Sequence, residues 1–478
     1  MNSDFIIGVI GLGYVGFPLA CLFADKYKVI GFDMSRERVD ELNAGHDHTA
    51  EVTAECHAKA LANGLKCTTE WEVLRACNVY IVAVPTPVDD QHHPDLTPLE
   101  KASRTVGEVI SKGDIVIYES TVYPGATEDF CAPIIEEVSG LKFNSDFFMG
   151  YSPERINPGD KDHRVENIRK ITSGSTPEIA ETIDRLYNSV LLNGTFRASS
   201  IKVAEAAKIM ENTQRDINIA FMNEMAVVMN AIGIGISEVI EAAGTKWNFL
   251  KFQPGLVGGH CIGVDPYYLI DKAKQVGIYP RLTAEARRIN EAMGGYVAER
   301  IIKCMTLNGK AENNARILLL GFTFKENCPD IRNTKVVEIY KRLAPYTSYI
   351  DVLDPWVNPD MAQKEYGIKT VSSIDGLRYS SYDAVVHCVA HDCFRELDFN
   401  SLCAEDGGIV FDAKGTLPPP YDKYLNTNKL YDEYNNSNLL QKNEKKQKFN
   451  HSDGIGNPGT EKSACSSLAA CGHDCLLG

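Results

Sequence analysis

The sequence predicts an α/β protein with two Rossmann-like, doubly wound parallel-sheet domains joined by a long central helix. Short apolar strand patterns alternate with helical patterns in both halves of the chain. A glycine-rich turn follows the first strand pattern, and a long helical stretch without proline lies between the halves. With 478 residues, the chain is also too long to fold around one hydrophobic core.

Composition indicates an ordinary globular protein, with 44% hydrophobic and 24% charged residues. The formal net charge of −15 argues against nucleic acid or an anionic membrane as the main partner. No apolar run approaches the roughly 20 residues that cross a membrane. The 14 cysteines form no recognisable disulfide framework. We therefore expect a cytoplasmic protein with reduced cysteines, no membrane partner and no metal.

The first strand pattern, residues 5–10, leads into a turn that carries three glycines. The turn reads Gly11, Leu12, Gly13, Tyr14, Val15 and Gly16. The first glycine permits the tight turn, the second leaves room for a pyrophosphate, and the third lets the next helix pack closely. A second strand pattern ends at Asp33, where a carboxylate accepts bonds from ribose hydroxyls and repels a 2′-phosphate. This pattern predicts an NAD site, to which we also assign Arg38.

Three further strand patterns, residues 79–84, 114–118 and 147–151, end in loops that hold polar residues. These residues are Thr86, Thr121 and Glu154, and each taken singly also suits an ordinary turn. Ligands bind outside the carboxyl ends of the strands in an open parallel sheet. We therefore expect the three residues to line one crevice with the glycine turn.

The long helical stretch, residues 200–232, carries Lys208 and Asn212 four residues apart. That spacing places both side chains on one face of a helix. Together they can donate hydrogen bonds to a developing oxyanion. The spacing equally suits a solvated surface stripe, so it does not settle their role.

A loop at residues 255–268 holds Cys261 among four glycines, with Asp265 four residues further on. A thiol in such a loop can act as a nucleophile when its pKa is lowered. Cysteine is also a common small core residue. The loop alone therefore leaves both interpretations open.

The second half repeats the α/β layout without a second glycine fingerprint. Its strand patterns cover residues 317–320, 349–353, 384–389 and 409–411. Lys325 and Arg332 flank the start of the helix after the first of these strands. Positive side chains beside a helix terminus suit an anion.

Five motifs, taken in order, resemble the UDP-glucose/GDP-mannose dehydrogenase family over residues 5–418. They are residues 11–16, residues 119–124, residues 205–208 with Asn212, residues 258–265, and residues 321–325. Within the family, residues 152–160 and 260–268 are most similar to members that oxidise UDP-N-acetylglucosamine. One departure is Pro158, because the UDP-glucose enzymes have a second glutamate at that place.

The resemblance implies a four-electron oxidation of the C6 alcohol of a UDP-N-acetylhexosamine to the acid, with NAD as acceptor, for surface polysaccharide synthesis. UDP-N-acetyl-D-glucosamine is the expected substrate, and UDP-N-acetylgalactosamine, UDP-N-acetylmannosamine and UDP-glucose remain open. Cys261 would form a thiohemiacetal and then a thioester, while Lys208 and Asn212 stabilise the oxyanion. Asp265 would assist proton transfer, and Glu154 and Thr121 would position or activate the hydrolytic water.

The resemblance also implies the binding residues and the assembly. Arg332 joins the cofactor residues. The expected substrate-binding residues are Glu154, Arg155, Asn157, Lys208, Asn212, Gly258, His260 and Lys325. We expect a homodimer formed around the long helix.

The predicted domains are an NAD-binding domain (1–199), a central helical domain with the cysteine (200–308), a UDP-sugar domain (309–434) and a disordered tail (435–478). Two rival functions remain. One is a two-electron hydroxyacid dehydrogenase, which would not need Cys261. The other is a non-catalytic NAD-binding protein.

Overall fold

The computed structural model describes residues 5–89, 91–156, 165–310, 314–405, 407–417 and 422–423. Asn157, Pro158 and the predicted tail lie outside these residues. Contacts assign residues 1–427 to one unit. Among the described helices, none is both long and apolar enough to cross a membrane.

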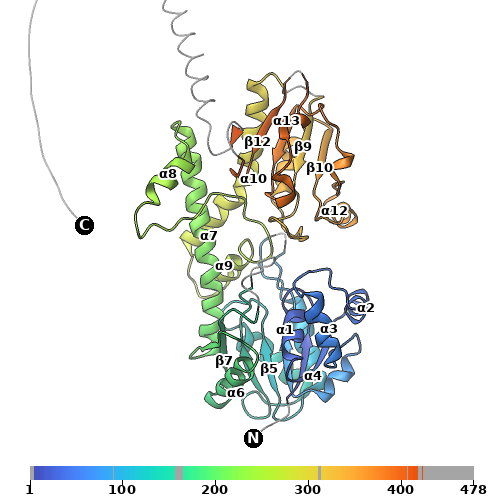
Figure 1. Ribbon diagram of the computed structural model, residues 1–478. Coiled ribbons are helices and arrows are strands. Elements are labelled where there is room, and N and C mark those ends of the chain that lie inside the picture. The colour runs from blue at the N-terminus through green and yellow to red at the C-terminus, as the bar shows by residue number, and fades with distance from the viewer. Residues whose placement is uncertain are drawn as a thin grey trace, which may run out of the picture. The chain divides into compact units, whose positions relative to one another are not determined.

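The first sheet, which contains the strands labelled β5 and β7 in Figure 1, has eight strands in the order β3-β2-β1-β4-β5-β6-β7-β8. They are β1 (Ile6–Ile10), β2 (Lys28–Phe32), β3 (Lys66–Thr68), β4 (Val79–Val82), β5 (Ile115–Tyr118), β6 (Phe148–Tyr151), β7 (Lys170–Gly174) and β8 (Thr195–Arg197). Neighbouring strands run parallel except β6 and β7, which are antiparallel. The order reverses between β1 and β4, which is where an open sheet of this kind forms its ligand crevice.

Helices follow the strands of this sheet in sequence. They are α1 (Gly16–Phe23), α2 (Arg36–Asn43), α3 (Ala54–Ala62), α4 (Thr97–Val109), α5 (Ala132–Ser139) and α6 (Pro177–Asn188). Local sequence explains several ends. The side chain of Ser35 accepts from the N–H of Arg38 at the start of α2, and α5 ends at Gly140 with a positive φ of 72°.

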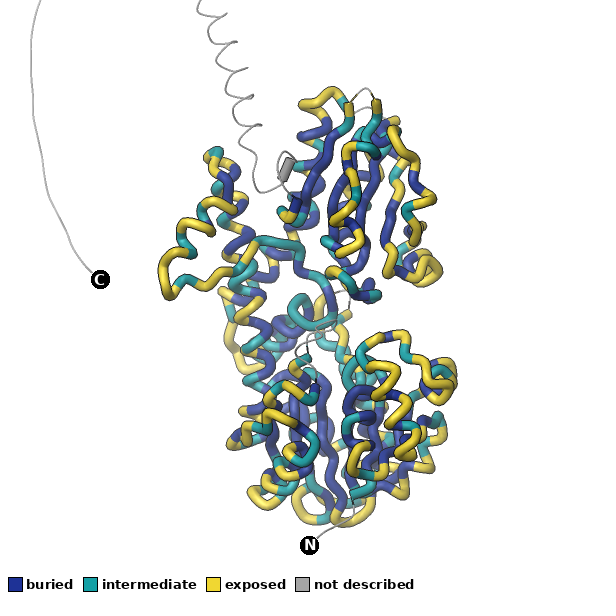
Figure 2. Tube along the Cα trace, in the orientation of Figure 1, coloured by how far each residue is buried: buried dark blue, intermediate teal, exposed yellow. Residues whose placement is uncertain are grey.

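The second sheet has five strands in the order β10-β9-β11-β12-β13, all parallel. Its elements are β9 (Arg316–Leu320), α11 (Val336–Leu343), β10 (Tyr349–Leu353), α12 (Pro359–Tyr366), β11 (Ala384–His387), α13 (Phe399–Leu402), β12 (Ile409–Asp412) and β13 (Asp422–Lys423). In both sheets the central strands are buried, as the dark blue tubes of Figure 2 show. Burial on both faces explains why these strands are nearly continuous apolar runs.

Four helices lie between the two sheets in the sequence: α7 (Ile201–Ala231), α8 (Ile236–Ala243), α9 (Asp265–Gln275) and α10 (Arg281–Leu307). With 31 residues, α7 is about 46 Å long at 1.5 Å per residue. It packs along α10, where Asn223 donates to Asn290 at 2.8 Å and Asn230 to the hydroxyl of Tyr296 at 3.1 Å. The predicted fold class is therefore confirmed.

Several elements differ from the sequence prediction. The strand predicted to reach Val389 ends at His387, because the N–H groups of Cys388 and Val389 both donate to the carbonyl of Leu320 and turn the chain away. The short strands β3, β7, β8 and β13 were not predicted, and neither were α8 and α9. Asp265-Pro266 at the start of α9 is a recognisable start signal for a helix.

Candidate active site

The glycine turn between β1 and α1 has the geometry that a bound pyrophosphate requires. Gly11 has a φ of +91°, and a Cβ there would lie 2.7 Å from the carbonyl oxygen of Ala83. A Cβ on Gly16 would lie 1.8 Å from the carbonyl oxygen of Gly11, so no side chain fits. A Cβ on Gly13 would meet nothing within 4 Å. The turn is thus tight at both ends and open in the middle.

Asp33 lies at the end of β2, directly beside this turn. Its Oδ2 accepts from the N–H of Leu12 at 2.8 Å, and its Oδ1 accepts from the N–H of Ser35 at 2.9 Å. The residue is half-buried, so the carboxylate retains an accessible edge. A carboxylate in this place fits the ribose of NAD.

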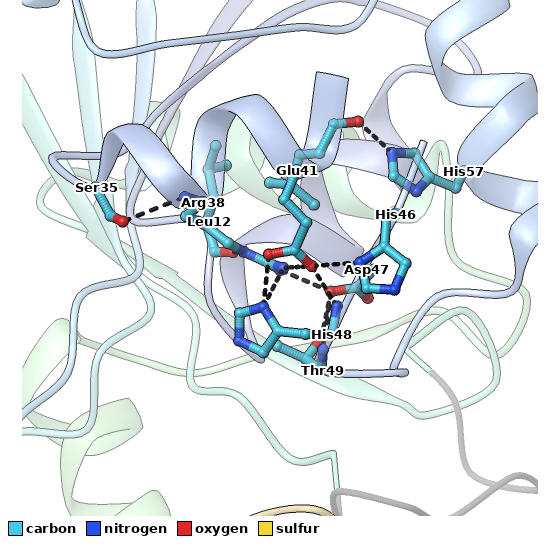
Figure 3. A network of polar contacts seen from close by, with 10 residues as sticks. Leu12, Ser35, Arg38, Glu41, His46, Asp47, His48, Thr49 and His57 are labelled. Carbon is cyan, nitrogen blue, oxygen red and sulfur yellow. Dashed lines mark hydrogen bonds and ion pairs between the residues drawn. The ribbon is translucent and has the colours of Figure 1, made fainter. Parts of the chain in front are cut away.

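Arg38 supports the turn from behind (Figure 3). Its Nε donates to the carbonyl of Leu12 at 2.9 Å, and its remaining nitrogens contact Asp47 at 2.7 Å and Glu41 at 3.2 Å. The side chain is buried. We predicted Arg38 as a cofactor residue, and the structure shows its guanidinium bound to protein groups beneath the glycine turn.

The other predicted cofactor residues lie at the ends of the same strands. Val15 precedes α1, and Thr121 follows β5 after the buried Ser120. The Thr86 side chain hydrogen-bonds to Tyr268, whose hydroxyl also donates to the carbonyl of Pro87 at 3.0 Å. Helix α9 is therefore attached to the loop after β4.

A cavity of about 600 Å³ brings many of the predicted catalytic and substrate residues together. The predicted residues that line it are Arg155, Lys208, Asn212, Gly258, His260 and Cys261. Lys208 and Cys261 are 53 positions apart in the sequence, and no local sequence pattern predicted that they line the same cavity. Arg169, Glu211, Arg215 and Phe324 also line the cavity, and no sequence pattern singled them out.

Helix α7 fixes the cysteine loop at both ends. Near the loop's end, Asn212 donates to Oδ2 of Asp265 at 2.5 Å. At its start, Asn223 makes two bonds to Gly255, accepting from the N–H at 2.8 Å and donating to the carbonyl at 3.0 Å. Within the loop, the N–H of Asp265 donates to the carbonyl of Cys261 at 2.8 Å.

The surroundings of Cys261 favour a thiolate. Burial raises the pKa of the thiol. The charge and hydrogen bond of His260 and the charge of Lys208 lower it by more than burial raises it, so the net shift is downward. Burial raises the pKa of Asp265 to about 6, although Lys208 opposes that shift. A thiol with a lowered pKa and a carboxyl group with a raised pKa thus lie close together, which is the arrangement that a nucleophile and a proton-transfer group would need.

His260 is joined to residues of the loop after β9. Its Nδ1 lies 2.9 Å from a terminal nitrogen of Arg332 and 3.3 Å from Oδ2 of Asp330. Arg332 binds both carboxylate oxygens of Asp330, and its guanidinium lies 4.8 Å from the ring centroid of Tyr14. Arg332, predicted as a cofactor residue, therefore reaches the glycine turn through Tyr14. Asp330 was missed, although it stands two residues before Arg332.

Glu154 is turned away from the cavity toward a buried network. Its Oε1 accepts from the N–H groups of Arg155 and Ile156 at 2.5 and 2.6 Å, and its Oε2 lies 3.4 Å from Nζ of Lys170. Its backbone carbonyl accepts from Nζ of Lys208 at 2.6 Å. Glu154 thus contacts the candidate oxyanion residue through its backbone rather than its carboxylate.

Lys170, fully buried in β7, was missed because a single lysine in an apolar strand carries no distinguishing signal. Its Nζ donates to Glu119 at 2.6 Å, and Glu119 also accepts from the hydroxyl of Tyr187 at 2.5 Å. Burial raises the pKa of Glu119 to about 7 despite the opposing charge of Lys170. Lys325, predicted to bind substrate, lies 5.5 Å from the ring of Phe324, which itself lines the cavity.

Comparison with known proteins gives matches along most of the chain. Three domains of the UDP-glucose/GDP-mannose dehydrogenase family match in order. They are the NAD binding domain at residues 5–191, the central domain at 202–292 and the UDP binding domain at 318–419. The limits of our predicted domains stay a prediction.

Two relatives are named UDP-N-acetyl-D-glucosamine 6-dehydrogenase. The Pseudomonas aeruginosa protein is 55% identical over 84% of this chain and 94% of its own length. The Salmonella typhi protein is 51% identical over 86% of this chain and 96% of its own. A solved structure of a UDP-D-ManNAc dehydrogenase from Pyrococcus horikoshii is similar, with a TM-score of 0.80, 31% identity, and coverage of 88% of this chain and 99% of that one.

Proposed function

Because the chain belongs to the UDP-glucose/GDP-mannose dehydrogenase family, we propose that it oxidises the C6 alcohol of UDP-N-acetyl-D-glucosamine to the acid and reduces two NAD per sugar. It is an NAD-dependent oxidoreductase. The choice of sugar rests on the two relatives with that name, which are 55% and 51% identical to the chain over the matched residues. The observation that carries the chemistry is the shared cavity of Cys261, Lys208 and Asn212.

Gly13 and Asp33 would hold NAD, which when bound would supply the hydride acceptor for C6 in each oxidation. The proton of the C6 hydroxyl passes to Asp265, directly or through water, and the side chains of Lys208 and Asn212 donate to the C6 oxygen as it becomes anionic. The Cys261 thiolate adds to the carbonyl carbon of the aldehyde, so a C–S bond forms and the carbonyl electrons move to oxygen. Loss of the second hydride from that thiohemiacetal leaves a thioester on Cys261.

Hydrolysis then releases the acid. Water adds to the thioester carbon, the C–S bond breaks, and Cys261 leaves as a thiolate. Asp265, whose pKa burial raises to about 6, can take and return a proton near neutral pH. We assign Thr121 and Glu154 to positioning this water, Glu154 through the loop that its carboxylate organises.

The central test measures NADH formed per sugar consumed with UDP-glucose, UDP-N-acetylglucosamine, UDP-N-acetylgalactosamine, UDP-N-acetylmannosamine and GDP-mannose. We expect two NADH per UDP-N-acetylglucosamine and the highest kcat/KM for that sugar. One NADH per sugar would instead favour a two-electron dehydrogenase. A higher kcat/KM for another sugar would change the substrate but keep the chemistry.

The matched variants Cys261→Ser and Cys56→Ser test the nucleophile, because Cys56 is exposed and does not line the cavity. We expect Cys261→Ser to lose acid formation by at least about 10³-fold while it keeps NAD and sugar binding. Cys56→Ser should keep full activity. Normal acid formation by Cys261→Ser would remove the covalent pathway.

A homodimer is part of this proposal. Helix α7 carries the exposed apolar side chains Val203, Met210, Phe221 and Val228 at spacings close to whole helical turns. We expect Phe221→Glu to weaken the dimer in sedimentation equilibrium, and the exposed Gln363→Glu on α12, which adds the same charge away from α7, to leave it intact. A cytoplasmic location and a role for the product in surface polysaccharide synthesis remain predictions.

A further inference from the structure

The ring of His260 has polar neighbours on two sides, which a residue that only contacted substrate would not need. The residue precedes Cys261 in the chain, and both line the same cavity. On its other side, Nδ1 lies within reach of an acceptor, Oδ2 of Asp330 at 3.3 Å, and of a donor, Arg332 at 2.9 Å. A side-chain hydrogen bond joins His260 to Cys261. A thiol, an imidazole and a carboxylate are thus linked in that order, which is the arrangement of a nucleophile, its base and the group that orients the base.

We propose that His260 is the base that takes the proton of Cys261, forming a thiolate–imidazolium pair, with Asp330 and Arg332 as positioning residues. This inference rests on the proposed function, in which Cys261 is the nucleophile. The proton moves from Sγ of Cys261 to the imidazole, and no other bond changes. The thiolate electron pair then forms the C–S bond with the aldehyde.

The position of the His260 ring can stay the same whether the ring is protonated or neutral, because Nδ1 has a hydrogen-bond partner in both states. When the ring is protonated, the N–H at Nδ1 donates to Asp330, which keeps its two bonds from Arg332. When the ring is neutral, Nδ1 can accept from Arg332. The rings of Tyr14 and Phe324 pack against the imidazole, with centroids 6.0 and 6.4 Å away.

The charges around the pair agree with proton transfer. Burial lowers the pKa of His260, but the thiolate of Cys261 and the bond to Asp330 raise it to about 9 against the opposing charge of Arg332. At Cys261, the charge of Asp265 opposes the thiolate, and Lys208 favours it.

The same pair serves the last step of the proposed reaction. A thiol with an ordinary pKa is a poorer leaving group than one stabilised by a neighbouring cation. The imidazolium of His260 lies beside the departing sulfur of the thioester. It therefore favours expulsion of Cys261 as a thiolate, ready for the next turnover.

The experiment measures iodoacetamide labelling of Cys261 against pH, residue by residue, by mass spectrometry on the intact protein without sugar. The variants are His260→Gln, Asp330→Asn and the control His93→Gln, in which the replaced histidine is exposed and lies outside the cavity. We expect wild type and His93→Gln to label Cys261 with a midpoint below the ordinary thiol value. His260→Gln should shift the midpoint upward and slow labelling at pH 7 about tenfold, because an unassisted thiol is only a few per cent ionised there. Asp330→Asn should give a smaller shift in the same direction.

An unchanged profile in folded His260→Gln would overturn the inference. If that variant does not fold, the thiolate absorbance of Cys261 is measured against pH as the difference between a protein with Cys261 and the same protein with Cys261→Ser. This difference is taken once in the wild-type protein and once in Asp330→Asn. A midpoint below the ordinary thiol value that rises in the Asp330→Asn background supports the pair, and an ordinary or equal midpoint overturns it. Labelling needs no sugar, so a failure of the proposed substrate or stoichiometry is seen separately in the NADH assay.

Discussion

The two sheets share one local arrangement, in which a glycine follows the first strand and an aspartate at the end of the next strand accepts from the backbone beside that glycine. The two halves use this arrangement differently. In the first, the N–H of Gly11 donates to Phe32 at the end of β2, and Asp33 accepts from the N–H of Leu12. In the second, the N–H of Gly321 donates to Leu353 at the end of β10, and Asp354 accepts from the N–H groups of Phe322 and Thr323 at 2.6 and 2.9 Å. Both glycines have a φ near +90°.

The two sheets differ in the segment that comes after the glycine. Residues 11–15 lead directly into α1, and Asp33 stays half-buried at the crevice. Residues 321–335 form a longer loop before α11, and Asp354 is fully buried under His391 at 3.0 Å. The short turn leaves a place for a cofactor, while the long loop carries Asp330 and Arg332 to His260. A strand–glycine–aspartate frame therefore does not by itself make a dinucleotide site.

The largest expected effect comes from replacing the buried aspartate. Asp354→Ala removes the acceptor for two backbone N–H groups and His391, and we expect it to lower the free energy of unfolding by about 3 kcal/mol. Asp33→Ala removes acceptors at a half-exposed position and should lower it by about 1 kcal/mol. Chemical denaturation of both variants measures this. Equal losses would contradict the distinction between the two sites.

The next effect is on the cofactor. We expect Asp33→Ala to weaken NAD binding about tenfold, or about 1.4 kcal/mol, because the ribose loses a charged acceptor. In Asp354→Ala, provided that it is folded, NAD affinity should be unchanged. Titration calorimetry gives both constants, and an unaltered affinity in Asp33→Ala would place the ribose elsewhere.

The smallest effect is a difference in pH response. In the first half, burial raises the pKa values of Glu119 and Glu205 from 4.5 to about 7, so the folded state binds these protons more tightly. Their contribution is therefore present at low pH and is lost as pH rises toward 7. In the second half, burial acts upward on the pKa of Asp354, but His391 and backbone N–H groups lower it overall. That contribution is present above the ordinary value of 3.8 and is lost only below it.

Hydrogen exchange tests this difference in the intact protein. Between pH 7 and pH 4.5, the opening free energy of peptides from β5 and β6 should rise by about 1 kcal/mol relative to peptides from β9 and β11. Glu205→Gln should reduce that rise. The exposed Glu224→Gln is the matched control, and an equal change in both sheets would contradict the assignment.

The sequence was sufficient for what local pattern determines. The strand–turn–helix at Gly11 and the apolar central strands could be predicted, because each produces a pattern within a short stretch of sequence: spaced glycines in the turn, and a continuous apolar run in a strand buried on both faces. Lys170, Glu119 and Asp330 could not, because their roles depend on partners 51, 51 and 70 positions away. Glu154 shows a further limit, since its motif was visible but its carboxylate is held by the N–H groups of Arg155 and Ile156 and by the distant Lys170.

Asn212 and Asn223 stand on the same helix, and 11 residues of α7 separate them by about 16 Å. One fixes the end of the cysteine loop and the other its beginning, while Lys208 stands one turn from the first. Cys261 and the two side chains proposed to receive the oxyanion are therefore held by one helix, Cys261 through the ends of its loop. The position of the cysteine loop relative to Lys208 and Asn212 is thus set by α7 and by the bonds that attach the loop to it.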